Sequence, residues 1–164
     1  MLKYHRDSLE PNCNQTLADT IVDMQLLSQI TTRIRLYSSE CNQTAIVLEA
    51  IKQTKTNIQV FAAIHVVDEL SYQRQKTALQ EALQTYGRHN ILGVVVGNLF
   101  MYNYLQSNVT NVNSTAGLAA SAILKTKIND IRQMLQGMNI NLPVGTADAG
   151  NFFNNDLIGA MDFG

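Results

Sequence analysis

The sequence predicts an α/β fold built on a parallel sheet, and three observations carry this prediction. First, 46% of the 164 residues are hydrophobic, which is enough for the buried core of one globular domain. Second, short apolar runs alternate along the chain with longer segments of helical period. Third, no stretch rich in Pro, Gly and Ser divides the chain. This alternation is typical of β/α units that form a parallel sheet.

Five segments are predicted as strands. Residues 32–37 alternate polar and apolar side chains, whereas 58–67 and 91–96 are continuous apolar runs, as in strands covered on both faces. A further run ends at Val144, and a short first strand lies at the start of the chain. The expected strands cover residues 2–4, 32–37, 58–67, 91–96 and 140–144.

The segments between these strands have apolar residues at helical spacing. Thr16 is expected to cap the first helix, because Asp19 stands where the acidic residue of a capping box stands. The stretch from 103 to 115 is dense in Asn, Ser and Thr and is predicted to be a loop. The later helices are expected over residues 43–53, 72–86 and about 116–136.

The surface is predicted to be polar but weakly charged. Charged residues make up 15% of the chain, below the roughly 25% of an average soluble protein, and the net charge is −1. This balance argues against nucleic acid or a membrane surface as a partner and favours a neutral polar ligand. The first ten residues contain no apolar run of signal-peptide length, and no segment approaches the ~18 apolar residues of a membrane span.

Most common site motifs are absent. The segment Gly93–Gly97 lacks the spacing of a dinucleotide fingerprint, and the loop Gly145–Gly150 is followed by Asn151 where a phosphate-binding loop needs Lys. No G-x-S-x-G nucleophile elbow is present. The three histidines are scattered without ligand spacing. We therefore expect no metal site and no cofactor.

The cysteines and glycosylation sequons carry less information. Cys13 and Cys41 are too few for a disulfide scaffold and match no zinc pattern, so two free thiols and one disulfide are equally compatible with the residues alone. Four Asn-x-Ser/Thr sequons are more than the couple expected by chance, which is a weak sign of secretion. They begin at Asn14, Asn42, Asn108 and Asn113.

Polar residues follow several of the predicted strands. Tyr37, Asp68, Asn98 and Asp148 each stand at or just after a strand end. Because the carboxyl ends of parallel strands meet at one rim, these side chains are candidates for a shared site. Strand ends also meet polar loops in any such fold, so both interpretations remain open on periodicity alone.

Three segments carry a resemblance to a known family. Residues 32–37 (TRIRLY), 40–43 (ECNQ) and 92–98 (LGVVVGN) resemble the fungal members of glycoside hydrolase family 17. Residues 144–150 (VGTADAG) resemble the fifth-strand segment of that family, and the similarity extends from about Pro11 onward. These enzymes are cell-wall β-1,3-glucan hydrolases and glucan-transferring enzymes with a (β/α)8 barrel. The resemblance implies that residues 1–164 form a single incomplete domain, a partial (β/α)8 TIM-type barrel with about five parallel strands.

The resemblance also predicts that the chain is inactive as given. Retaining glycosidases use two carboxyl groups about 5–5.5 Å apart, one as acid/base and one as nucleophile. The family's acid/base Glu directly follows the Asn of the fourth strand, and Leu99 occupies that position here. Loss of a general acid costs on the order of 10²–10⁴ in rate. The nucleophile belongs to a seventh strand, which would lie beyond Gly164, so neither catalytic Glu is expected.

The family's binding features are carried over residue by residue. The resemblance places Asn98 beside the sugar 2-hydroxyl, Tyr37 along the glucan cleft and Asp148 on the same rim. The expected partner is thus a neutral polysaccharide, β-1,3-glucan. Cys13 and Cys41 match cysteines that flank the first helix of fungal relatives, which implies a disulfide and a secreted or cell-wall location.

Three functions are compatible with the resemblance and its departures. The chain is an active hydrolase or transferase in which Asp68 or Glu69 replaces the missing acid, an inactive relative that still binds glucan, or a degenerate partial product with an interaction role. A half barrel also leaves strand edges unpaired. We expect Val95 and Ile64 to be exposed. The chain alone is then expected to be marginally stable, to dimerise, or to be completed by a partner chain.

Overall fold

The computed structural model describes residues 1–6, 12–106 and 111–164. Its five strands are all parallel and lie in the order β1-β2-β3-β4-β5, which confirms the predicted sheet. The strands are β1 (Leu2–Tyr4), β2 (Arg33–Leu36), β3 (Gln59–Ile64), β4 (Ile91–Val96) and β5 (Val144–Gly145). The α-helices are α1 (Leu17–Leu27), α2 (Gln43–Thr54), α3 (Glu69–Tyr86), α4 (Phe100–Leu105), α5 (Thr115–Gly137) and α6 (Asn155–Ile158), and the 3-10 helices are η1 (Glu40–Asn42) and η2 (Gly150–Phe152).

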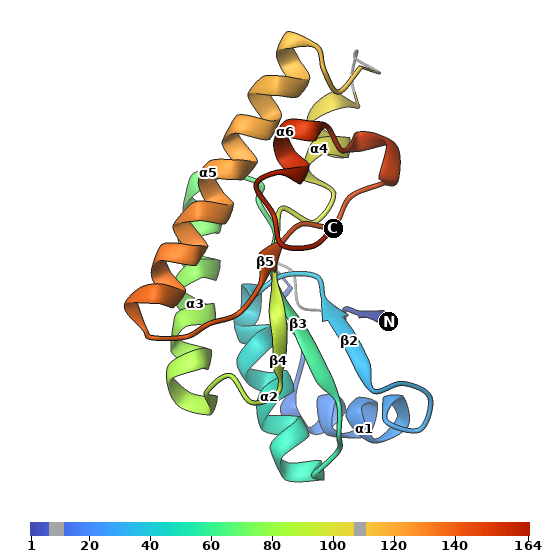
Figure 1. The fold of residues 1–164 in the computed structure, drawn as a ribbon. Helices are drawn as coiled ribbons and strands as arrows, with labels where there is room; N and C mark the ends of the chain where they lie inside the picture. The colour runs from blue at the N-terminus through green and yellow to red at the C-terminus, as the bar shows by residue number, and fades with distance from the viewer. Residues whose placement is uncertain (7–11, 107–110) are drawn as a thin grey trace.

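The helices cover the sheet from one side. Helices α2, α3 and α5 stand side by side on the outer face, whereas the short helices α4 and α6 lie beyond the carboxyl ends of β4 and β5 (Figure 1). Within the described residues, β1 pairs only with β2, so the sheet is not closed into a full barrel. No helix in the described ranges has the length and apolar character needed to cross a membrane.

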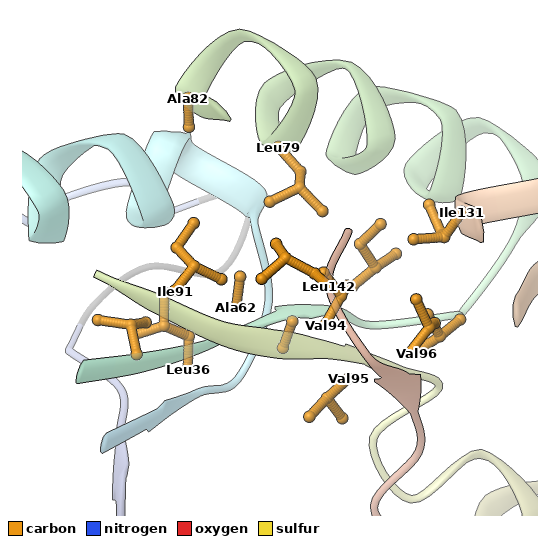
Figure 2. Close-up of a cluster of buried hydrophobic side chains, with 14 of the residues drawn as sticks. Leu36, Ala62, Leu79, Ala82, Ile91, Val94, Val95, Val96, Ile131 and Leu142 are labelled. Carbon is orange, nitrogen blue, oxygen red and sulfur yellow. The ribbon is translucent and has the colours of Figure 1, made fainter. Parts of the chain in front are cut away.

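The main core lies between β4 and the outer helices. Val94 and Val96 point toward Leu79 of α3 and Ile131 of α5, and Val95 points to the other face of the sheet (Figure 2). The four side chains on the helix side are fully buried. Each such burial stabilises the fold by about 1.5–3 kcal/mol, so the apolar runs of the sequence are explained by this layer.

The expectation that Val95 and Ile64 are exposed is wrong. Ile64 is fully buried and Val95 is 1% exposed. The inner face carries its own aromatic cover, in which the rings of Phe61 and Phe163 lie 5.2 Å apart between centroids. A Cβ atom added to Gly93 would lie 3.1 Å from the Phe163 ring, so the missing side chain lets that ring approach the sheet.

The same C-terminal segment covers the free edge of β5. The Asp162 amide donates to the Val144 oxygen over 3.0 Å, and the Thr146 amide donates to the Phe163 oxygen over 3.3 Å. The carboxylate of Asp162 also accepts a hydrogen bond from the Val144 amide. Main-chain groups at this edge are thereby satisfied, as edge strands require.

Several boundaries differ from those predicted. The strand expected over 58–67 ends at Ile64, because Asp68 caps the following helix by accepting from the Ser71 amide. The strand expected over 140–144 is reduced to two residues. The stretch expected as a loop from 103 begins inside α4, while the N-terminal cap of α1 by Thr16 is confirmed.

Candidate functional site

The turn that follows β4 has an unusual backbone. Gly97, Asn98 and Leu99 have φ values of 104°, 24° and 68°, all in the left-handed half of conformational space. Glycine adopts such values at little cost, but leucine does so rarely. A Cβ atom at Gly97 would also lie 2.6 Å from Cδ1 of Leu124, whose side chain would have to shift, but the φ value alone already favours glycine here. The turn leads directly into α4 and leaves Leu99 half-buried at its start.

Asn98 ties the end of β4 to the end of β2. Its side chain is fully buried, and its Nδ2 atom donates to the main-chain oxygen of Tyr37 over 2.6 Å. Its Oδ1 atom accepts from Nη1 of Arg35 over 3.1 Å. The expected sugar-binding residue thus lies at the carboxyl ends of the strands, where it also joins two elements that are not neighbours in the sheet.

Tyr37 is the centre of a cluster of rings and a cation. Its ring lies 4.8 Å from that of His65 and 5.4 Å from that of His5, measured between centroids. The Lys3 ammonium lies 4.1 Å above the Tyr37 ring, in a cation–π contact. Burial lowers the pKa of His65, which favours the neutral imidazole. The ends of β1, β2 and β3 therefore present amphipathic rings on one rim.

Two cations face each other beside this cluster. Lys3 and Arg35 are directly opposite in the β1–β2 register. Burial lowers the pKa of both groups, and the charge of Arg35 lowers that of Lys3 further. The β1–β2 part of the rim is thus positive, although the chain as a whole is close to neutral.

Asp148 binds the start of α4. Its carboxylate accepts from the amides of Met101 at 2.8 Å, Tyr102 at 3.2 Å and Ala149 at 2.9 Å. A carboxylate at a helix N-terminus pairs with unsatisfied amides. Burial nevertheless raises the pKa of Asp148, while these amides act in the opposite direction. Asp148 holds the helix that begins just after Leu99, a role that the sequence alone did not reveal.

A cavity of about 260 Å³ lies on the inner face of the sheet next to these residues. Arg35, Phe61, Asp148 and Phe163 contribute to its lining, together with Thr146. The hydroxyl of Thr146 is buried and has no hydrogen-bond partner among the described residues. The cavity therefore has an aromatic wall, and the Thr146 hydroxyl lies buried behind its lining.

The two acids considered as replacements for a catalytic Glu are engaged elsewhere. Asp68 caps α3 through the Ser71 amide. Glu69 accepts from Lys127 of α5 on the outer helical layer. Neither carboxylate has a hydrogen bond to a residue of the turn after β4.

Gln75 is a residue that the sequence reading missed. It is fully buried on α3, and its Oε1 atom accepts from the amides of His65 at 2.8 Å and Ser39 at 3.3 Å. Its Nε2 atom donates to the His65 oxygen over 2.8 Å. Gln75 thus fixes the loops that carry the aromatic cluster. Gln75 lies four residues before Leu79 and therefore on the same face of the helix, which could have predicted its burial.

Cys13 and Cys41 form a disulfide across 28 residues of sequence. It joins the segment before α1 to η1, which follows β2. The bond therefore anchors the loop after Tyr37 to the preceding β/α unit.

Comparison with known proteins identifies the lineage of this fold. A model of the BtgE/BtgC glycoside hydrolase domain matches residues 2–164. The putative glucan endo-1,3-beta-glucosidase btgC of Aspergillus niger is 33% identical over 144 residues, which are 86% of this chain and 20% of that protein. The glucan 1,3-beta-glucosidase of Schizosaccharomyces pombe is 29% identical over 152 residues, which are 88% of this chain and 43% of that protein. The chain thus spans about a fifth to two fifths of these relatives.

Solved structures show the same fold. The glycoside hydrolase family 17 β-1,3-glucanosyltransferase from Rhizomucor miehei has a TM-score of 0.72 at 18% identity, over 98% of this chain and 53% of the other. An endo-laminarinase from Formosa has a TM-score of 0.68 at 14% identity, over 98% and 47% of the two chains. The five described strands therefore correspond to part of a TIM-type barrel, as the resemblance implied.

Proposed function

Because the chain belongs to the BtgE/BtgC glycoside hydrolase domain family, we propose that it binds β-1,3-glucan at the carboxyl ends of its strands and does not hydrolyse it. One observation carries the proposal. Leu99 stands directly after Asn98 at the end of β4, where the family resemblance places the acid/base Glu. The binding rim is proposed to persist while the proton-transferring group is missing.

Leu99 cannot take part in proton transfer. Cleavage of a glucosidic bond requires a group that protonates the leaving oxygen, and a leucine side chain has no proton to give. Asp148, on the same rim, accepts from Met101, Tyr102 and Ala149, so both its oxygens are engaged with main-chain amides. Its structural role at α4 supports the view that it does not replace the Glu.

The rings at the rim are suited to binding a sugar. Tyr37 is half-buried among Lys3, His5 and His65, and this cluster combines apolar ring surfaces with polar edges, which suits a neutral sugar. The names of the relatives refer to β-1,3-glucan substrates, and a Rhizomucor miehei glucanosyltransferase with a TM-score of 0.71 was solved with laminaritriose. We therefore propose that the glucan lies along the rim at Tyr37, and that Asn98, which is fully buried and bonded to Tyr37 and Arg35, supports this rim.

The test separates binding from turnover. The purified chain is incubated with insoluble β-1,3-glucan for co-sedimentation and with laminarin for release of reducing sugar. We expect co-sedimentation and no turnover above a boiled control. Tyr37→Ala should abolish co-sedimentation. Tyr86→Ala is the matched control, because Tyr86 ends α3 at the opposite end of the strands.

Two results would decide against the proposal. Turnover above the boiled control would show that another group supplies the proton. Equal co-sedimentation of the Tyr37 and Tyr86 variants, both with an unchanged melting temperature, would show that the rim does not hold the glucan. The third function, a scaffold or degenerate product, would then be favoured.

The location is proposed from the disulfide. The bond between Cys13 and Cys41 is stable in oxidising compartments and rare in the cytosol. We therefore place the protein in the secretory route or the cell wall. Detection of the oxidised form in a cell-wall fraction by thiol labelling would support this, and detection of only free thiols would contradict it.

We propose that the chain associates with itself through the unpaired edge of strand β1. Strand β1 pairs on one side only among the described residues, and Leu2 on it is 41% exposed. The β5 edge is covered by residues 162–163. We expect a dimer that pairs through β1. A compact monomer at all concentrations in size-exclusion chromatography would contradict it.

A further inference from the structure

The chain contains the tetrapeptide Cys-Asn-Gln-Thr twice, at residues 13–16 and 41–44. Each copy ends in a glycosylation sequon, and the cysteine before each sequon is one half of the disulfide. The Cα atoms of Cys13 and Cys41 lie 5.3 Å apart, so oxidation brings Asn14 and Asn42 to one place on the surface. The two sequons have the same chemistry but different structural settings.

The sequon at Asn14 lies outside regular structure. Asn14 and Thr16 are both exposed, and Thr16 stands before the first residue of α1 as its cap. Its hydroxyl bonds only with groups of its own turn, accepting from the amide and donating to the carboxylate of Asp19. Between them Gln15 is buried and donates to Thr20 over 3.0 Å, so the two sequons differ in their threonine: Thr16 is exposed and has no hydroxyl contact with the core.

The sequon at Asn42 is partly inside a helix. Asn42 is exposed, but Gln43 and Thr44 are buried within the first turn of α2, at 0% and 1% exposure. The Thr44 hydroxyl lies 2.9 Å from the hydroxyl of Ser39, within hydrogen-bond distance. The side chain of Gln43 also donates to that of Gln15 over 3.4 Å, which joins the two copies below the surface. Once this packing forms, the second sequon cannot extend.

Glycosylation requires an extended and reachable sequon. The Nδ2 atom of the asparagine forms a bond to the anomeric carbon of a sugar carried on a lipid pyrophosphate. The bond from that carbon to the pyrophosphate oxygen breaks, the lipid pyrophosphate leaves with the electron pair, and one Nδ2 proton is released. The Thr hydroxyl two residues later must reach the same enzyme, so a buried Thr blocks the transfer.

We propose that Asn14 is an N-glycosylation site of this protein and that formation of the Cys13–Cys41 disulfide closes the site at Asn42. The proposal rests on the secretory location proposed above. The glycan at Asn14 would cover the disulfide and the start of α1. Asn113 serves as an internal reference, because it and Thr115 are exposed and lie on the α5 side of the chain, away in sequence from both cysteines. The fourth sequon, at Asn108, lies outside the described residues.

The experiment expresses the full chain behind a cleavable signal sequence in yeast. Occupancy of each sequon is measured by peptide mass spectrometry after endoglycosidase treatment. Total cell protein is used, so that a misfolded variant that is not secreted is still measured. We expect Asn14→Gln to lose an endoglycosidase-sensitive step and Asn42→Gln to lose none. Cys13→Ser leaves both sequons intact and should raise occupancy at Asn42 several-fold without changing occupancy at Asn113.

Each outcome decides for or against the proposal. An unmodified Asn14 overturns the first part, whether or not Asn113 is modified. Occupancy at Asn42 that is equal in the parent and the Cys13→Ser variant overturns the second. The deglycosylated protein is tested separately for glucan co-sedimentation. If Asn14 is occupied in cells but the deglycosylated protein does not bind glucan, only the proposed function is contradicted. If Asn14 is unoccupied but the protein binds glucan, only this inference is contradicted.

Discussion

The side-chain Nδ2 atom of Asn98 donates to the main-chain oxygen of Tyr37 over 2.6 Å, across 61 residues of sequence. This bond and the one from Arg35 consume both ends of a buried amide. Asn98→Ala leaves the Tyr37 oxygen and the Arg35 guanidinium without this partner. An unsatisfied buried polar group costs about 1–3 kcal/mol, and we expect the free energy of unfolding to fall by that amount.

Urea denaturation measures this change. Asn103→Ala is the matched control, because Asn103 is exposed on α4 and makes the same chemical change near the same rim. We expect the control to stay within about 0.5 kcal/mol of the parent. Equal midpoints for the two variants would show that the Asn98 bonds contribute little to the fold.

Gln75→Leu tests the link that supports the aromatic cluster. The leucine fits the apolar stripe of α3 but leaves the His65 and Ser39 amides without their acceptor. We expect a loss of about 2–4 kcal/mol, since more than one buried group is orphaned. Gln73→Leu, exposed on the same helix, should cost little. Thermal melts of both variants would check this, and a Gln75 variant as stable as the parent would contradict it.

These residues show what the sequence could and could not predict. The strands and the Thr16 cap follow from local patterns, because periodicity and capping act over a few residues. The contacts of Asn98, Gln75 and Asp148 join segments that are ten to more than sixty residues apart, and no local pattern encodes them. The sequence predicted that Asn98 and Asp148 lie near one rim but not the groups they bind.

The burial of Val95 was missed for a related reason. Val95 and Phe163 line the same cavity on the inner face, and the Phe163 ring lies against Gly93 while residues 162–163 pair along β5. A strand count alone cannot show that a short terminal segment folds back over the inner face. Whether the inner face is covered depends on single positions, such as a glycine that lies against an aromatic ring.

Reduction of the disulfide is expected to destabilise the chain. The bond between Cys13 and Cys41 closes a loop across 28 residues. The entropy of a loop of this length corresponds to about 3–4 kcal/mol. Urea denaturation with and without reductant measures the difference. The double variant Cys13→Ser/Cys41→Ser is the control, and its stability should not respond to reductant. A parent chain that is equally stable in both conditions would contradict the prediction.

Acid should weaken the contact between α3 and α5. Burial acts to raise the pKa of Asp130, but the bonds from Lys76 and Tyr72, at 2.6 Å and 2.7 Å, outweigh it and lower this pKa below 3.8. A lowered pKa stabilises the folded state at pH values above the unfolded pKa, and the stabilisation is lost as the pH falls through the folded one.

Asp130→Asn removes this dependence. The parent should be more stable than the variant at pH 6, and the difference should shrink as the pH falls below about 4. Urea denaturation over this range checks it. Asp156→Asn, which removes a surface pair with Lys125, is the comparison and should cost at most about 1 kcal/mol. A difference between parent and Asp130→Asn that does not change with pH would contradict the prediction.

Leu99→Glu restores a carboxyl group at the position where the resemblance places the acid/base. We expect no release of reducing sugar from laminarin, because a retaining mechanism needs a second carboxylate about 5–5.5 Å from the first. The resemblance places that second group on a seventh strand, whereas the described residues form five. Leu99→Gln is the matched control for the polar change at a residue with φ of 68°. Turnover by the Glu variant and not by the Gln variant would show that this chain already provides the second carboxylate. Leu99 would then be the cause of the inactivity, and the expectation that five strands lack the nucleophile would be wrong.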